Sequence, residues 1–450
     1  MKLESRTLLF LSLAGLALRL AFLALEPATH PVADERVWLG WSLEPPDGIA
    51  SPRVAFNPWR TKIIFHPPVF PYLVGAAYTA FGGLTAVKLL QAVAGALLIP
   101  AVGRIGLMAF GPRVGLAAAA MTAFYPELVW YSVHFWSEPV FLALLWWAIE
   151  GVLGADAKAS LGRAVGAGVV WGLAVLTRET ALYFVPFAAL WLAWRSVGGV
   201  RRAAAFAVAA FLVVAPWTYR NWVLFHALVP VSTMGGLNLW QGNGGLSREE
   251  LYARYEAVQG RIEQFEYARR MGMEAILRRQ PTWFFEKVYE QAPHFWEIDS
   301  LAVLHIHRGA YGPVRPSMAI AAALVVILPY LVVMTLFVPG LALLRLDRPR
   351  LLLMGFFVYY LLLHVASYGY SRFRVPILPA LFLLAAYFVA GRREGSLPGW
   401  TLARKAFAVA VGLGLALSMV PSVRRNLGYP AYGLGGAAAV PDEESRPAER

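Results

Sequence analysis

Long apolar runs recur along most of this 450-residue chain, and they constrain its fold more than any other feature. A run of about 20 apolar residues is long enough to cross the hydrocarbon core of a bilayer as a helix. Lipid offers the backbone no hydrogen-bond partners, so a single spanning segment must satisfy its own polar groups as a helix. With 58% hydrophobic residues, well above a soluble domain, the sequence predicts an all-α polytopic membrane protein.

The order of apolar runs and basic loops predicts eleven spans with a cytoplasmic N-terminus and an outer C-terminus. The expected spans are 8–25, 85–110, 114–131, 139–154, 164–176, 181–194, 203–217, 318–341, 351–368, 375–390 and 406–420. The short, proline-rich segment 66–82 is expected to lie at the outer surface. If it crossed, the basic loops around Arg113, Arg163 and Arg345 would move outside, against the positive-inside rule. Arg424 and Arg425 fall outside and oppose this topology mildly.

Four regions follow from this topology. They are an N-terminal membrane module at 1–230 with a first outer loop at 26–84, an outer helical insertion at 231–316, C-terminal membrane helices at 317–420, and an outer tail at 421–450. In the insertion, Ser247 and Glu250 have the spacing of a capping box, 264–279 has helical periodicity, and Pro281 suits the first residue of a further helix. The tail has too little apolar surface to fold alone and is expected to be disordered.

Charge and composition exclude several functions. The net charge of +13 comes mostly from loops between spans, so it indicates topology and predicts no nucleic-acid partner. The absence of cysteine excludes disulfides, thiolate metal sites and a thiol nucleophile. His294, His305 and His307 do not have the spacing of a zinc site. No metal ligand and no required cofactor are therefore predicted, and a divalent cation stays unsupported.

The acidic pair Asp34 and Glu35 lies a few residues beyond the first span, at the outer interface. Other polar residues return to the same side of the membrane. They are His66, Lys88, Glu138, Arg178, Arg220, Asn221, Asn238, Asn243, Arg372 and Arg374. Polar groups near membrane depth are costly and often functional. Convergence at one rim of a helical bundle suits a site that binds a lipid-linked anion and activates a hydroxyl, although any single residue can instead be an interface anchor.

The order of these motifs along the chain resembles that in the polyprenyl-phosphate-sugar-dependent glycosyltransferases of the GT-C fold. The branch concerned is similar to protein O-mannosyltransferases and aminoarabinose transferases. The resemblance is carried by ALRL at 17–20, Asp34-Glu35, HPP at 66–68, SEP at 137–139, TRE at 177–179, PWTYRN at 216–221, VPVST at 229–233 and RFRVPILP at 372–379. The chain departs from the pattern at Trp38, where many relatives carry tyrosine, and at His66, where others carry lysine.

The resemblance implies a GT-C-like bundle of about eleven transmembrane helices, with outer interfacial helices and a small outer helical insertion. It also implies that Asp34 takes the proton from the acceptor hydroxyl, with Glu35 beside it. Partial burial next to Glu35 would raise the pKa of Asp34 from about 3.9 towards a useful value. Glu138 joins this catalytic group as a residue that orients the sugar or the base, or else only caps its helix.

The leaving lipid phosphate requires positive charge. Arg372 and Arg374 are the first candidates because a planar guanidinium binds phosphate oxygens in a bidentate way, and headgroup anchoring is the alternative. His66, Lys88 and Arg178 are further phosphate candidates. For the sugar or acceptor, the candidates are Arg220, Asn221, Asn238 and Asn243, the last two in a glycine-containing segment that could instead be a plain loop.

We therefore predict an inverting glycosyltransferase that moves a monosaccharide from a polyprenyl-phosphate donor to a hydroxyl on the outer face of the inner or plasma membrane. The acceptor is a glycan, a lipid-linked glycan or a protein, and membrane lipid is a further partner. One alternative is a transporter or flippase of a lipid-linked saccharide, but no inverted repeat is evident. Another is an O-antigen ligase or polymerase, in which the main catalytic groups are expected in a late outer loop.

Overall fold

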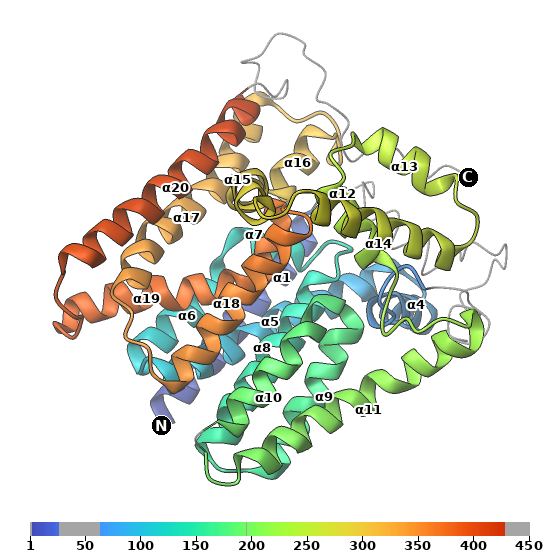
Figure 1. Cartoon of the computed structure of the whole chain (residues 1–450). Helices are drawn as coiled ribbons and strands as arrows, with labels where there is room; N and C mark the ends of the chain where they lie inside the picture. The colour runs from blue at the N-terminus through green and yellow to red at the C-terminus, as the bar shows by residue number, and fades with distance from the viewer. Residues whose placement is uncertain (1, 27–63, 195, 428–450) are drawn as a thin grey trace.

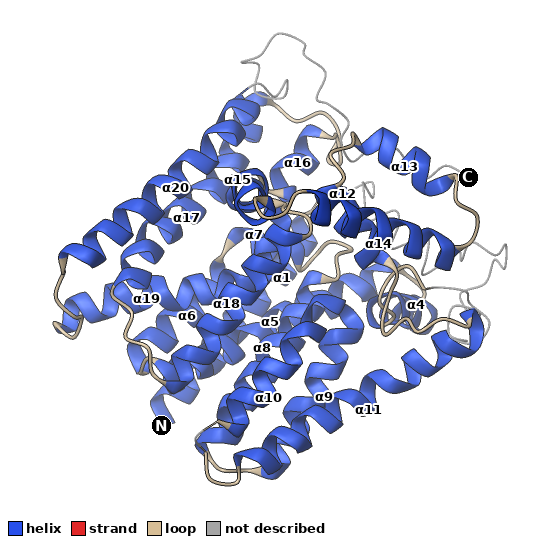
Figure 2. Cartoon of the chain, viewed as in Figure 1, coloured by secondary structure: helices blue, strands red, loops and turns tan. Residues whose placement is uncertain are grey.

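The computed structural model describes residues 2–26, 64–194 and 196–427, which form a bundle of helices without a strand in these ranges (Figures 1 and 2). Eight helices are long and apolar enough to cross a membrane. They are α1 (Lys2–Leu25), α5 (Leu84–Ala109), α8 (Glu138–Ala157), α11 (Gly199–Phe225), α17 (Pro316–Ala342), α18 (Arg348–Ala366), the continuous helical stretch Ser371–Glu394 formed by η2 (Ser371–Ile377) and α19 (Leu378–Glu394), and α20 (Leu402–Leu427). The prediction of an all-α multi-pass membrane protein is confirmed.

The three other expected spans are helical but shorter. They correspond to α6 (Pro112–Phe124) with α7 (Pro126–Tyr131), to α9 (Leu161–Thr177), and to η1 (Glu179–Phe184) with α10 (Val185–Ala193). Proline lies in the first turn of both α7 and α10, where a new helix starts readily and an old one cannot continue. These three fall short of the spanning length, so the count of eleven stays a prediction.

The proline-rich segment that was expected not to cross forms α4 (Val69–Phe81). Thirteen residues rise about 20 Å, which is less than the hydrocarbon core of about 30 Å. The helix ends at Gly82 in the left-handed conformation. Its buried Phe70 and Val74 belong to one apolar cluster with Val87 and Val140, and α4 packs against α5 and α9.

Five helices make up the expected outer insertion: α12 (Met234–Asn243), α13 (Arg248–Glu256), α14 (Arg261–Arg278), α15 (Trp283–Trp296) and α16 (Leu301–His307). The capping box of Ser247 and Glu250 is confirmed, and α14 covers most of the expected periodic segment. The expectation for Pro281 is wrong, because α15 starts two residues later, after the turn that contains this proline. At the end of the chain, α20 continues to Leu427, into the region predicted as tail.

Glycine at helix contacts brings α9 close to α11. A Cβ added at Gly168 would lie 2.3 Å from the Phe206 carbonyl oxygen, and one at Gly172 would lie 2.6 Å from Val213 Cβ. Small residues allow such close backbone approach in membrane bundles. This packing fixes α9, whose last turn leads directly to Arg178.

Candidate functional site

Three charged side chains from separate parts of the chain meet at Glu138, the first residue of α8. Arg178 follows α9, and Arg372 lies in the short helix η2 (Ser371–Ile377). Arg178 Nη1 lies 2.6 Å from Glu138 Oε1, and Arg372 Nε lies 2.5 Å from the same oxygen. The sequence analysis named all three residues, but their mutual contact depends on helix packing.

This cluster is buried and carries a formal net charge of +1. The Glu138 side chain is 0% exposed, and the Arg178 and Arg372 side chains are 14% and 9% exposed. Aromatic rings fix the guanidinium groups, because Arg372 lies 4.1 Å from the Trp136 ring centroid and Arg178 lies 5.8 Å from that of Phe141. Such a pair of arginines can bind an anionic oxygen group.

Glu138 Oε2 is buried and has no hydrogen-bond partner among the described residues. Its other oxygen accepts from both arginines, which stabilise the ionised carboxylate. A carboxylate held in this way is a weak base. The geometry thus favours a role for Glu138 in positioning Arg178 and Arg372 over direct proton abstraction.

A second buried cluster surrounds Glu26, whose partners could not be foreseen from the sequence. Lys88 Nζ lies 3.0 Å from Glu26 Oε2, and His134 Nε2 lies 2.9 Å from Oε1. Burial alone would raise the pKa of Glu26, but the hydrogen bonds and charges of His134 and Lys88 outweigh it and lower the pKa below its ordinary value. Lys88, a predicted phosphate ligand, thus forms an ion pair with Glu26.

Glu179, next to Arg178, is a site residue whose contacts the sequence analysis missed. Its Oε2 accepts a hydrogen bond of 2.7 Å from Ser232 Oγ, just before α12. A Cβ added at Gly235 would lie 2.8 Å from Glu179 Oε1, so glycine leaves room for the carboxylate. This contact joins the end of α9 to the start of the outer insertion. The motifs at 177–179 and 229–233 contained both partners, but not their pairing.

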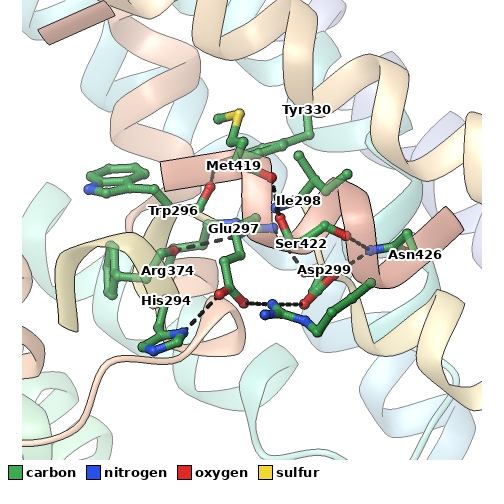
Figure 3. A network of polar contacts seen from close by, with 12 residues as sticks. His294, Trp296, Glu297, Ile298, Asp299, Tyr330, Arg374, Met419, Ser422 and Asn426 are labelled. Atoms are coloured by element: carbon green, nitrogen blue, oxygen red, sulfur yellow. Dashed lines mark hydrogen bonds and ion pairs between the residues drawn. The ribbon is translucent and has the colours of Figure 1, made fainter. Parts of the chain in front are cut away.

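Arg374 has a different environment from Arg372, although the two were predicted to act together. It is buried and donates to the carbonyl oxygens of Glu297, Phe295 and Asp299, the latter two at 3.4 and 3.2 Å. Its guanidinium also lies 4.1 Å from the Tyr330 ring centroid. These contacts favour a structural role, in which Arg374 holds the turn after α15, over the predicted phosphate contact (Figure 3).

The same turn is tied to the end of α20. Arg425 Nη2 lies 2.6 Å from Glu297 Oε2 and 2.7 Å from Asp299 Oδ2, and Asn426 Nδ2 donates to Asp299 Oδ1 at 2.5 Å. The Ile298 amide donates to Ser422 Oγ at 3.1 Å (Figure 3). In the predicted topology Arg425 lies on the outer side, where a basic residue is unexpected. Its two acidic partners explain why an arginine is present at this end of α20.

Burial and these contacts act in opposite directions on the two carboxylates of the turn. Burial alone would raise the pKa of Glu297, but His294 and Arg425 outweigh it and lower the pKa. For Asp299, burial dominates over the contacts with Arg425 and Asn426 and raises the pKa.

The predicted sugar-binding residues mostly bind neighbouring backbone and side chains. Asn221 Nδ2 donates to the Val229 carbonyl oxygen at 2.9 Å, and Arg220 Nη1 donates to Asn221 Oδ1 at 2.9 Å. Arg220 also lies 4.5 Å from the Trp217 ring centroid. These contacts fix the chain after α11 and favour structural roles for Arg220 and Asn221.

Asn243 has a similar environment at the end of α12. Its Nδ2 donates to the carbonyl oxygens of Leu239 and Ala366 at 2.9 and 3.0 Å, and its Oδ1 accepts from Trp283 Nε1 at 2.9 Å. It therefore links α12, α15 and the end of α18. Asn238 is half-buried on α12.

The remaining predicted residues are only partly described. His66 is buried and packs edge-on against Phe65, with ring centroids 4.9 Å apart. Asp34 and Glu35 lie outside the described residues, so their catalytic roles stay predictions. Within the described ranges, no group of three or more His, Cys, Asp or Glu residues is placed to hold a metal ion.

A family model described as dolichyl-phosphate-mannose-protein mannosyltransferase matches residues 65–220. That range contains His66, Lys88, Glu138 and Arg178 of the site. The resemblance to GT-C glycosyltransferases is confirmed there. A comparison with curated proteins finds no match.

Two kinds of solved structure are similar to this chain. The archaeal oligosaccharyltransferase AglB from Archaeoglobus fulgidus, in complex with an inhibitory peptide and a dolichol-phosphate, is 16% identical with a TM-score of 0.49. The match covers 98% of this chain and 58% of AglB, so the chain spans little more than half the length of that protein. ArnT from Cupriavidus metallidurans in the apo state is 17% identical with a TM-score of 0.38, covering 85% of this chain and 77% of ArnT.

Proposed function

We propose that this protein is an inverting glycosyltransferase that uses a monosaccharide on a polyprenyl phosphate as donor and a hydroxyl as acceptor, at the outer face of the inner or plasma membrane. The observation that carries the proposal is the buried cluster of Arg178, Glu138 and Arg372. Two arginines that converge on one buried carboxylate are suited to bind the phosphate oxygens of such a donor. The matched family model, named for a lipid-phosphate mannose donor, supports the same donor class.

The proposed reaction is a direct displacement. The acceptor oxygen forms a bond to the anomeric carbon while the bond from that carbon to the phosphate oxygen breaks, and polyprenyl phosphate leaves with the bonding electrons. Asp34 takes the proton of the acceptor hydroxyl. Arg372 and Arg178 stabilise the negative charge that develops on the leaving phosphate, and such electrostatic stabilisation is commonly the largest contribution to catalysis.

The test is turnover by the purified full chain in nanodiscs, with a panel of short-chain polyprenyl-phosphate sugars and scoring of released polyprenyl phosphate. We expect release from at least one donor, and we expect Arg372→Ala to raise the KM for that donor. Arg278→Ala is the matched control, because this arginine is exposed and pairs with the neighbouring Glu274 on α14. Specific binding of one donor with no release would contradict the proposal and favour the transporter.

A further inference from the structure

Helix α15 in the outer insertion has two faces of different character. One face is built into the protein, because the Lys287 ammonium is buried, donates to the Gly242 carbonyl oxygen and lies 3.0 Å from Glu290 Oε2. The other face carries four exposed large apolar side chains: Phe284, Phe285, Val288 and Tyr289. At 100° per residue these four occupy an arc of about 140°, opposite Lys287.

The contacts of α15 place this helix beside the end of α18. Gly369, three residues after α18, donates its amide to Gln291 Oε1 of α15 at 2.8 Å. Asn243 connects the start of α15, through Trp283, to the last residue of α18, Ala366. Tyr330 of α17 donates its hydroxyl to the Trp296 carbonyl oxygen at 2.9 Å. In Figure 1, α15 is seen nearly end-on, next to the end of α18 that leads to η2.

Helix α18 carries an exposed apolar side chain close to the end that contacts α15. Leu362, one turn before the end of α18, is exposed on the surface of the bundle. The start of α15 is thus tied to the end of a membrane helix whose surface is still apolar in its last turns. Aromatic residues are enriched where membrane helices meet the interface, because their rings suit the boundary between acyl chains and headgroups.

The charges beside the exposed face do not oppose contact with lipid. Arg279 lies 2.6 Å from Glu286 and 2.5 Å from Glu290, and Lys287 also pairs with Glu290. The two carboxylates of α15 nearest to the aromatic side chains are therefore compensated by cations. Phe285 and Tyr289, at 75% and 83% exposed, are left as the most prominent groups on this surface.

We propose that α15 is an interfacial helix whose Phe284, Phe285, Val288 and Tyr289 insert into the outer leaflet of the bilayer. An amphipathic helix of this kind lies in the plane of the interface with its apolar face at the boundary of headgroups and acyl chains. The turn after α15 is held by Arg374, two residues from Arg372, so the lipid contact also fixes the depth of η2. The inference does not depend on the proposed glycosyl transfer.

The absence of native cysteine allows a direct test. Phe285→Cys and Tyr289→Cys are labelled with an environment-sensitive fluorophore and reconstituted in phosphatidylcholine–phosphatidylglycerol vesicles. Quenching by nitroxide-labelled lipid is then compared with quenching by aqueous iodide. Arg278→Cys is the control, since Arg278 is exposed on α14. Unchanged size-exclusion elution in each variant shows that the fold is kept.

We expect strong lipid quenching and several-fold weaker iodide quenching at 285 and 289 than at 278. Iodide quenching equal to that at 278 would overturn the proposal, because it would place the face in water. Protection from both quenchers would also overturn it, because it would indicate a covering protein surface such as a second copy of the chain.

Discussion

Glu138→Gln tests whether the buried carboxylate holds the two arginines in place. Glutamine keeps the size and one acceptor oxygen of glutamate but removes its charge. Hydrogen bonds to a charged group contribute about 1.5–3 kcal/mol, against about 0.5–1.5 kcal/mol between neutral groups. The two bonds at Oε1 should therefore lose about 2 kcal/mol together. Removing one partner of a buried ion pair costs about 3–5 kcal/mol, which sets the upper limit.

The assay is unfolding in nanodiscs, followed by tryptophan fluorescence. Glu274→Gln is the matched control, because Glu274 pairs with Arg278 at 3.2 Å on an exposed helix surface. Such an exposed pair contributes about 0.3–0.5 kcal/mol. We expect a loss of about 2–4 kcal/mol in the free energy of unfolding for Glu138→Gln and almost none for the control. Equal losses would refute the reasoning that burial makes the Glu138 contacts strong.

Three further predictions concern the other groups of the site. Asp34→Asn should abolish release of polyprenyl phosphate from the donor. The affinity of the variant for polyprenyl phosphate, measured by calorimetry, should stay near the wild-type value. Normal turnover would exclude Asp34 as the base. Arg374→Gln should lower the free energy of unfolding by about 1–3 kcal/mol, because it leaves buried carbonyl oxygens unpaired, with no change in donor affinity; weaker donor binding in a folded variant would restore its phosphate role. The lowered pKa of Glu26 means that its ion pairs stabilise the fold above its unfolded pKa of about 4.3, and that this stability is lost as the pH falls through the lower folded value. Glu26→Gln should therefore be less stable than wild type at pH 7, and the difference should shrink steadily as the pH is lowered below about 4.3; a difference that does not change with pH would contradict the assignment.

The membrane helices were predictable because a long apolar run is by itself enough to indicate a helix at that position. All eleven expected spans are helical, and α6 with α7 differs mainly because Pro126 starts a new helix. The insertion was also recognisable from local signals such as the capping box at Ser247. These features depend on residues close in sequence, which is why sequence reasoning finds them.

The partners of polar side chains were harder to predict. Arg372 and Arg374 look equivalent in sequence, yet one binds a buried carboxylate and the other binds backbone carbonyl oxygens. The residue type determines only how many hydrogen-bond donors a side chain has. The packing of helices that are distant in sequence determines which acceptors lie within reach. Asn243 shows the same limitation, because its acceptor at Ala366 is 123 residues away.

The link between α20 and the turn after α15 has a consequence for the order in which the protein is assembled. Asp299 is synthesised 126 residues before Arg425, its ionic partner. At about 5–20 residues per second, a ribosome needs roughly 6–25 s to produce this stretch. During that time the acidic turn is without the cation of α20. The outer insertion can therefore reach its final arrangement only after α20 has been synthesised, although the insertion itself is complete more than a hundred residues earlier.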